Sequence, residues 1–167
     1  MKYPTKKEIL KLPRPIFKRG TLAIISAWKW AFYKGWNEME MNAKLWHLQC
    51  LAEAICGLEG KPFIVTFNGA TNKYHPIGFG IELKEPYSVI SLLHELAHHL
   101  YGSNELTACR WSVWLYQLRF RKDYNKLIWQ EHTLVKPSST RIIKRYPSKK
   151  MKSDTTKSLV KQKTDGK

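Results

Sequence analysis

The sequence predicts an α+β fold in which N-terminal helices precede a short antiparallel sheet and a pair of helices that pack on each other. Apolar residues recur at steps of three and four between positions 21 and 58, which is the helical period. Two short runs, 63–67 and 77–83, have the composition or the alternation that is typical of strands. A second helical pattern fills positions 89–118 and is interrupted at Gly102.

Residues 1–20 form a basic arm that contains three prolines. Within it, Thr5 and Glu8 have the spacing of a capping box, so we expect one short helix there and extended chain elsewhere. Residues 21–135 form the predicted globular domain. Its first segment, 21–58, is helical, with expected breaks at Gly35 and Asn42.

The aromatic residues of the first helical segment admit two interpretations. Trp28 and Trp36 follow the helical spacing of core residues, whereas Trp28 and Trp30, with Lys29 between them, would also suit base stacking. The apolar run 21–33 is short and contains Lys29, so it does not predict a membrane span.

The run 63–67 is rich in β-branched and aromatic residues, and Asn68-Gly69 after it is a strong turn signal. The run 77–83 alternates apolar residues with small or polar ones, as a half-exposed strand would. We expect it to be either an edge strand beside the next helix or one half of an ordinary core hairpin.

The next helix, 91–101, contains the pattern His94-Glu95-x-x-His98. Residues four apart lie on one side of a helix, so His94 and His98 can bind one metal ion, while Glu95 is beside that face and can accept a proton from a metal-bound water. The alternative is a chance occurrence of unrelated histidines on a surface helix. The opposite side of the helix carries an apolar stripe for the core, formed by Val89, Leu93, Leu96 and Leu100.

A catalytic zinc site needs a third protein ligand, and Glu105 is the candidate. Gly102 reads as a helix terminator, and Ser103 or Asn104 as the N-cap of a new helix that Glu105 opens. A turn this short would fold the new helix back over the two histidines. The less favoured alternative is that Glu105 is only a first-turn acid, stabilised by the helix dipole. The other candidate ligands have no recognised spacing: His47, His75, His99 and His132.

These motifs resemble those of the zincin metallopeptidases over about residues 60–120, above all the SprT-like proteins, the ImmA/IrrE type and the minimal gluzincins. The resemblance implies a zincin-like fold, Zn²⁺ as cofactor and a protein or peptide substrate, with Glu95 as general base. In gluzincins the third ligand is a Glu on the following helix, which corresponds to Glu105. It also implies that strand 77–83 holds extended substrate. Four residues are candidate donors to the oxyanion: Tyr74, His75, Tyr101 and Arg110.

The chain has a net charge of +16 and a pI near 9.8. Residues 136–167 read as a disordered tail, and from Pro137 onward it holds ten Lys or Arg against two Asp. Such a tail either contacts nucleic acid non-specifically or is simply solvated. The three cysteines suggest no disulfide framework, and we expect them to be reduced and buried. With no evident signal peptide, we expect an intracellular, cytoplasmic protein that has no membrane contact.

Two other functions are compatible with the sequence. One is a metal-dependent hydrolase of a non-peptide substrate such as a phosphodiester. The other is a nucleic-acid-associated binding protein in which the motif helix is structural. The sequence predicts no oligomeric state.

Overall fold

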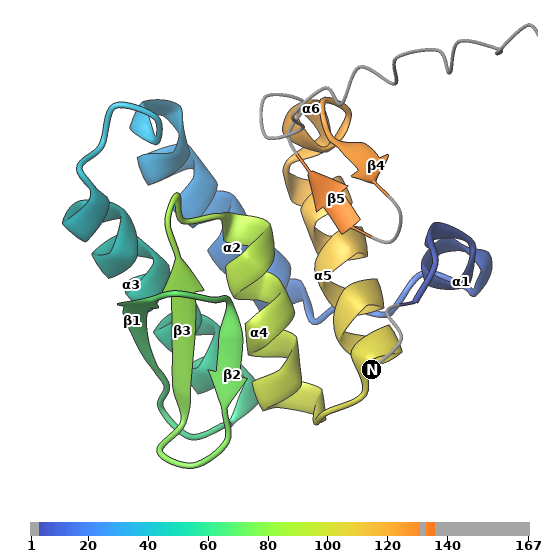
Figure 1. The fold of residues 1–167 in the computed structure, drawn as a ribbon, viewed down its shortest axis with the longest axis horizontal. Coiled ribbons are helices and arrows are strands. Elements are labelled where there is room, and N and C mark those ends of the chain that lie inside the picture. Colours follow the sequence, from blue (N-terminus) through green and yellow to red (C-terminus); the bar gives the residue numbers. More distant parts are fainter. Residues whose placement is uncertain (1–3, 131–132, 136–167) are drawn as a thin grey trace, which may run out of the picture.

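A small sheet lies at one side of a group of helices in the computed structural model, which describes residues 4–130 and 133–135 (Figure 1). The described residues form six α-helices, one 3-10 turn, a three-stranded mixed sheet and a two-stranded hairpin. The predicted α+β class is therefore confirmed. The predicted tail, 136–167, and His132 lie outside the described residues.

The N-terminal third is helical, as the apolar period predicts. Helix α1 spans Lys6–Lys11 and begins with the expected capping box between Thr5 and Glu8. Helix α2 spans Arg19–Phe32 and continues into the 3-10 turn η1, Tyr33–Gly35. Helix α3 spans Met41–Glu59 and ends at a left-handed Gly60. The break predicted at Gly35 is thus confirmed, whereas Asn42 lies inside α3 and breaks nothing.

The three-stranded sheet has the order β1-β3-β2. Strand β1 spans Val65–Gly69, β2 spans Lys73–His75 and β3 spans Gly80–Lys84. Strands β1 and β3 are parallel, and β2 is antiparallel to β3. The prediction of a purely antiparallel sheet is therefore wrong. The reason is topological. Strands β2 and β3 form an antiparallel hairpin, and β3 lies between β2 and β1, where it runs parallel to β1.

Of the two placements expected for residues 77–83, the edge strand is wrong, whereas the core hairpin agrees with the structure, in which β3 pairs with β2. Ile81 and Leu83 are fully buried, which fits the central position of β3. The edge strand near the motif helix is β2, whose three residues have no alternation that sequence could detect. The turn predicted at Asn68-Gly69 is strand instead. Gly69 is required there because a Cβ atom would collide with the side chain of Glu82 on β3.

Two packed helices follow the sheet. Helix α4 spans Val89–Tyr101 and lies between the sheet and helix α5, Glu105–Arg119 (Figure 1). After α5 come the short helix α6, Arg121–Tyr124, and the hairpin of β4, Ile128–Gln130, with β5, Thr133–Val135. None of the helices in the described part of the chain is both long enough and apolar enough to cross a membrane.

Helix α4 is the centre of the hydrophobic core. The four residues of its predicted apolar stripe are at most 4% exposed, and they pack with side chains of α2, α3, the sheet and α5. Trp28 and Trp36 join the same core, which confirms the core interpretation for these two residues, whereas Trp30 is 87% exposed. Most sides of α4 are therefore buried, and the two motif histidines lie on its partly buried face beside α5.

Candidate metal centre

The turn between α4 and α5 brings the three candidate ligands together. Gly102 ends α4 with a φ of 92°, and its N–H donates to the carbonyl of His98. Asn104 then caps α5, because its side chain accepts a hydrogen bond from the N–H of Thr107. Helix α5 runs back along α4. Glu105, in the first turn of α5, therefore faces the two histidines of α4.

The donor atoms of these residues converge on one point. Nε2 of His94 lies 3.0 Å from Oε1 of Glu105, and Nε2 of His98 lies 3.3 Å from Oε2. The two Nε2 atoms are 3.3 Å apart. All three side chains are partly buried, with 14% to 16% of each exposed. The sequence therefore identified three side chains that the tertiary structure does bring into mutual contact.

This arrangement fits a zinc ion. A tetrahedral zinc with nitrogen and oxygen ligands at about 2.0–2.1 Å holds neighbouring ligand atoms about 3.3–3.4 Å apart. The three distances are within 0.4 Å of that separation. The donor types also fit, since two imidazoles and one carboxylate leave a fourth position for water. The three residues are therefore candidate metal donors.

Each imidazole has a second partner on its other nitrogen. Nδ1 of His98 is 3.1 Å from the carbonyl oxygen of Gly102. Nδ1 of His94 is 3.8 Å from Sγ of Cys109 on α5. Partners of this kind hold a ligating imidazole in the tautomer that leaves Nε2 free for a metal. Contacts with Gly102 and Cys109, which are not in the donor set, thus orient both rings.

Cys109 offers an alternative donor set, because His94, Glu105 and Cys109 also place one donor atom each within 4.8 Å of the others. The sulfur of Cys109 contacts Nδ1 of His94, whereas the contact with His98 involves Nε2 of that ring. We favour the set with His98, because Nε2 of each histidine lies within 3.3 Å of an oxygen of Glu105 and the two Nε2 atoms are 3.3 Å apart. Sequence analysis gave Cys109 no part in the site, although its position four residues after Glu105 places both on one face of α5.

Glu95 lies beside the donor set and not in it. It is 8% exposed, and its Oε2 accepts a 2.8 Å hydrogen bond from the N–H of Tyr74 on β2. Burial raises the pKa of Glu95 above its ordinary value, against the opposing effect of the neighbouring histidines. The pKa of Glu105 is lowered, chiefly by its hydrogen bond to His94. The two carboxyl groups therefore differ in environment, although both lie close to the same histidines.

Other residues that the sequence suggested as metal ligands or oxyanion donors make hydrogen bonds with different partners. His99 contacts the hydroxyl of Tyr74 and the carbonyl of Pro62. His75 pairs with Glu82. Arg110 donates to carbonyls of the N-terminal arm at Ile9 and Pro13, which ties the arm to α5. Of the four candidate oxyanion donors, Tyr101 has a partly exposed side chain at the end of α4, and it contacts Trp111 of α5 through its ring and a side-chain hydrogen bond.

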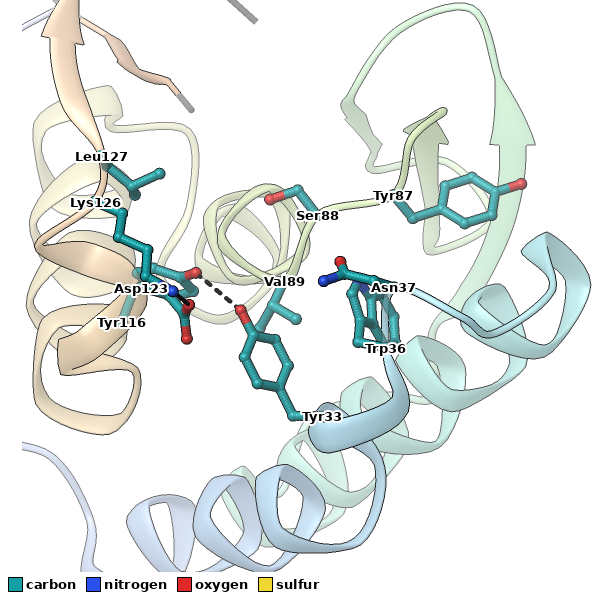
Figure 2. A pocket seen from close by; sticks show the side chains of 10 residues that line it. All are labelled: Tyr33, Trp36, Asn37, Tyr87, Ser88, Val89, Tyr116, Asp123, Lys126 and Leu127. Atoms are coloured by element: carbon teal, nitrogen blue, oxygen red, sulfur yellow. Dashed lines mark hydrogen bonds and ion pairs between the residues drawn. The ribbon is translucent and has the colours of Figure 1, made fainter. Parts of the chain in front are cut away.

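A separate hollow of about 300 Å³ lies at the opposite end of α4 (Figure 2). Its walls include the side chains of Tyr33, Trp36 and Tyr116, with Ser88 and Val89 at the start of α4. None of the metal donors lines it. The pairing of Asp123 with Lys126 at its rim leaves no dominant charge inside. The hollow is therefore distinct from the metal centre.

No protein family, no curated protein and no solved structure matches this chain in the comparisons.

Proposed function

We propose that this protein is a zinc-dependent metallopeptidase that hydrolyses peptide bonds of a protein or peptide substrate. The observation that carries the proposal is the convergence of His94, His98 and Glu105, whose donor atoms lie 3.0–3.3 Å apart, next to the carboxylate of Glu95. Two histidines and an acidic residue are a donor set that catalytic zinc sites use. The resemblance of the motif to zincins agrees with this proposal.

In this proposal His94, His98 and Glu105 hold Zn²⁺. When bound, zinc supplies a Lewis acid that polarises the scissile carbonyl and lowers the pKa of a coordinated water. The protein's part is to fix the three donors. The Nδ1 contacts of both rings keep Nε2 directed inward, and the cap at Asn104 fixes the first turn of α5, from which Glu105 projects.

Glu95 acts as general base and then as general acid. One of its oxygens is engaged by the Tyr74 N–H, which restrains the carboxylate, and the other oxygen is available to take a proton from the attacking water. The carboxyl group then delivers that proton to the departing amine. No covalent bond between enzyme and substrate is required.

The substrate would lie along β2. Tyr74 is opposite Ile81, and its N–H is directed away from β3 towards α4. In an antiparallel pair, the carbonyl of such a residue points to the same side as its N–H. The Tyr74 carbonyl is therefore suited to accept a hydrogen bond from the backbone of an extended peptide. In this proposal the free edge of β2 holds the substrate, a role that was expected for residues 77–83.

We further propose that the protein works in the cytoplasm of the cell. The three cysteines are unpaired, as expected in a reducing compartment. The net charge of +16 also favours encounters with polyanions at low salt, so a substrate bound to nucleic acid is compatible with the proposal. The fold in this proposal is zincin-like, built around helix α4.

The decisive experiment is zinc analysis of the purified protein beside His98→Ala, Glu105→Ala and a control, His99→Gln. His99 is also a histidine of α4 but faces Tyr74, so its variant should keep the metal. We expect one zinc per chain in the parent and control, and loss of zinc in both site variants. A parent protein that takes up no zinc from a zinc-containing buffer would refute the proposal. Cleavage of a peptide library, read by mass spectrometry, then tests the activity.

A further inference from the structure

We infer that Cys109 is a positioning residue of the metal centre, which holds the His94 ring in its metal-binding tautomer and fixes the carboxylate of Glu105. The inference rests on the proposed function, because it assumes that these two residues bind a metal. It adds a residue to which neither the motif nor its resemblance to zincins assigns a role.

The geometry that supports it involves both ligands at once. Sγ of Cys109 lies 3.5 Å from Oε1 of Glu105, in the direction of a thiol that donates to the carboxylate. The same sulfur lies 3.8 Å from Nδ1 of His94. A thiol has one weak donor and a weakly accepting sulfur, so it can donate to Glu105 and accept from His94 simultaneously. One side chain therefore links two of the three proposed ligands.

The need for such a residue follows from the position of His94 in the helix. His98 is near the end of α4, and its Nδ1 reaches the carbonyl of Gly102, just beyond the helix. His94 lies in the middle of α4, where the backbone carbonyls accept hydrogen bonds within the helix. An acceptor for its Nδ1–H must therefore come from a neighbouring element, and Cys109 on α5 supplies one.

The surroundings explain why this acceptor is a thiol. Cys109 is 7% exposed and belongs to a small hydrophobic cluster with Ile9 of α1 and Val113 of α5. A free cysteine packs as a small apolar side chain while keeping its weak polar character. Cys109 can thus fill the space between α1 and α5 and still contact the two ligands.

The test measures zinc affinity by competition with a chromophoric chelator, in the full-length chain. Cys109→Ala should weaken zinc binding by about tenfold or more, as loss of a residue that orients a ligand typically does. Cys109→Ser should retain most of the affinity, since its hydroxyl can also donate and accept. Val113→Ala is the matched control: it removes volume from the same cluster, so it should lower Tm without changing zinc affinity.

Three outcomes would overturn the inference. Equal zinc affinity of the parent and Cys109→Ala, with zinc bound in both, would reject it while leaving the proposed function intact. A serine variant as impaired as the alanine variant would show that Cys109 does not act by donating and accepting hydrogen bonds. A thiolate-to-metal charge-transfer band in the cobalt(II)-loaded parent that is absent from Cys109→Ser would make Cys109 a metal ligand instead. If the parent binds no zinc, the proposed function and this inference both fail.

Discussion

The backbone N–H of Tyr74 donates a hydrogen bond of 2.8 Å to Oε2 of Glu95. This bond joins the free edge of β2 to helix α4. The residue of α4 that accepts it, Glu95, directly follows the first motif histidine, His94. Glu95 is 8% exposed, and this contact with the sheet edge adds to the influence of the neighbouring His94 and His98. The orientation of the proposed general base thus depends on an element that is distant in sequence.

Replacing Glu95 with Gln should abolish turnover and leave the metal in place. The amide oxygen of Gln can still accept the Tyr74 N–H, so the local structure should persist, but an amide cannot accept the proton of the attacking water. We expect kcat/KM to fall by on the order of 10²–10⁴-fold, the usual contribution of a general base. The measurement is peptide cleavage, with zinc content determined on the same preparation. A Gln variant that cleaves as fast as the parent would exclude the proposed mechanism.

Gln49 of α3 protects the outer edge of β1, and its loss should destabilise the sheet. Its Nε2 donates to the carbonyl of Ile64 at 2.7 Å, and its Oε1 accepts from the N–H of Thr66. Gln49→Ala removes the hydrogen-bond partner of the Ile64 carbonyl and that of the Thr66 N–H. This loss should lower the free energy of unfolding by about 1–3 kcal/mol. Urea denaturation provides the measurement, with Asn42→Ala as an exposed control on the same helix. Equal stability of the two variants would mean that these contacts contribute nothing.

Gly102 is the position at which backbone conformation controls the site. Its φ of 92° is strained for any residue with a Cβ atom, although nothing lies within 4 Å of where that atom would be. We expect Gly102→Ala to lower the free energy of unfolding by about 1–3 kcal/mol. Zinc affinity should fall as well, because the turn positions Glu105 and its carbonyl contacts His98.

The control for this variant is Gly57→Ala in α3. Gly57 also has open space around it, but its φ is not positive, so Ala should stabilise the helix by roughly 0.5–1 kcal/mol. Chemical denaturation of both variants separates backbone strain from crowding. If Gly102→Ala is as stable as the parent, the turn does not require glycine.

Glu82 should contribute to the acid sensitivity of the fold. The N–H of Thr71 and the ring of His75 hold the pKa of Glu82 below its ordinary value of 4.5. The folded state therefore favours the ionised carboxylate. Its stabilising effect is complete above the unfolded-state pKa and is lost as the pH falls through the lower folded-state pKa. We expect Glu82→Gln to make the free energy of unfolding less dependent on pH below about 5, measured by urea denaturation at several pH values. An unchanged slope in this range would contradict the assignment.

Local patterns in the sequence predicted the parts of the site that lie close together along the chain. The four-residue step from His94 to His98 places both side chains on one face of any α-helix. The stop at Gly102 and the cap at Asn104 predicted where α4 ends and where α5 begins, and the structure has both. The contact of Glu105 with the histidines follows from this short turn, which is why a sequence argument could anticipate it.

The order of strands depended on contacts that no local pattern encodes. No local pattern in residues 73–75 or 80–84 indicates which of them lies at the edge of the sheet, yet β3 became the buried central strand and β2 an edge strand. The choice depends on which strand buries more apolar surface against α3 and α4, and this is a property of the assembled core. The parallel pairing of β1 with β3 follows from the same choice.

The sequence by itself determined the proposed metal donors, because residues four apart on a helix and residues on either side of a tight turn are held together by backbone geometry alone. Only the tertiary structure decided what surrounds them. The Tyr74 N–H reaches Glu95 because the sheet packs against α4, and the Cys109 thiol reaches His94 because α5 folds back along that helix. These contacts join residues 15 and 21 positions apart, and the burial of a shared core, not the local chain, brings such residues together.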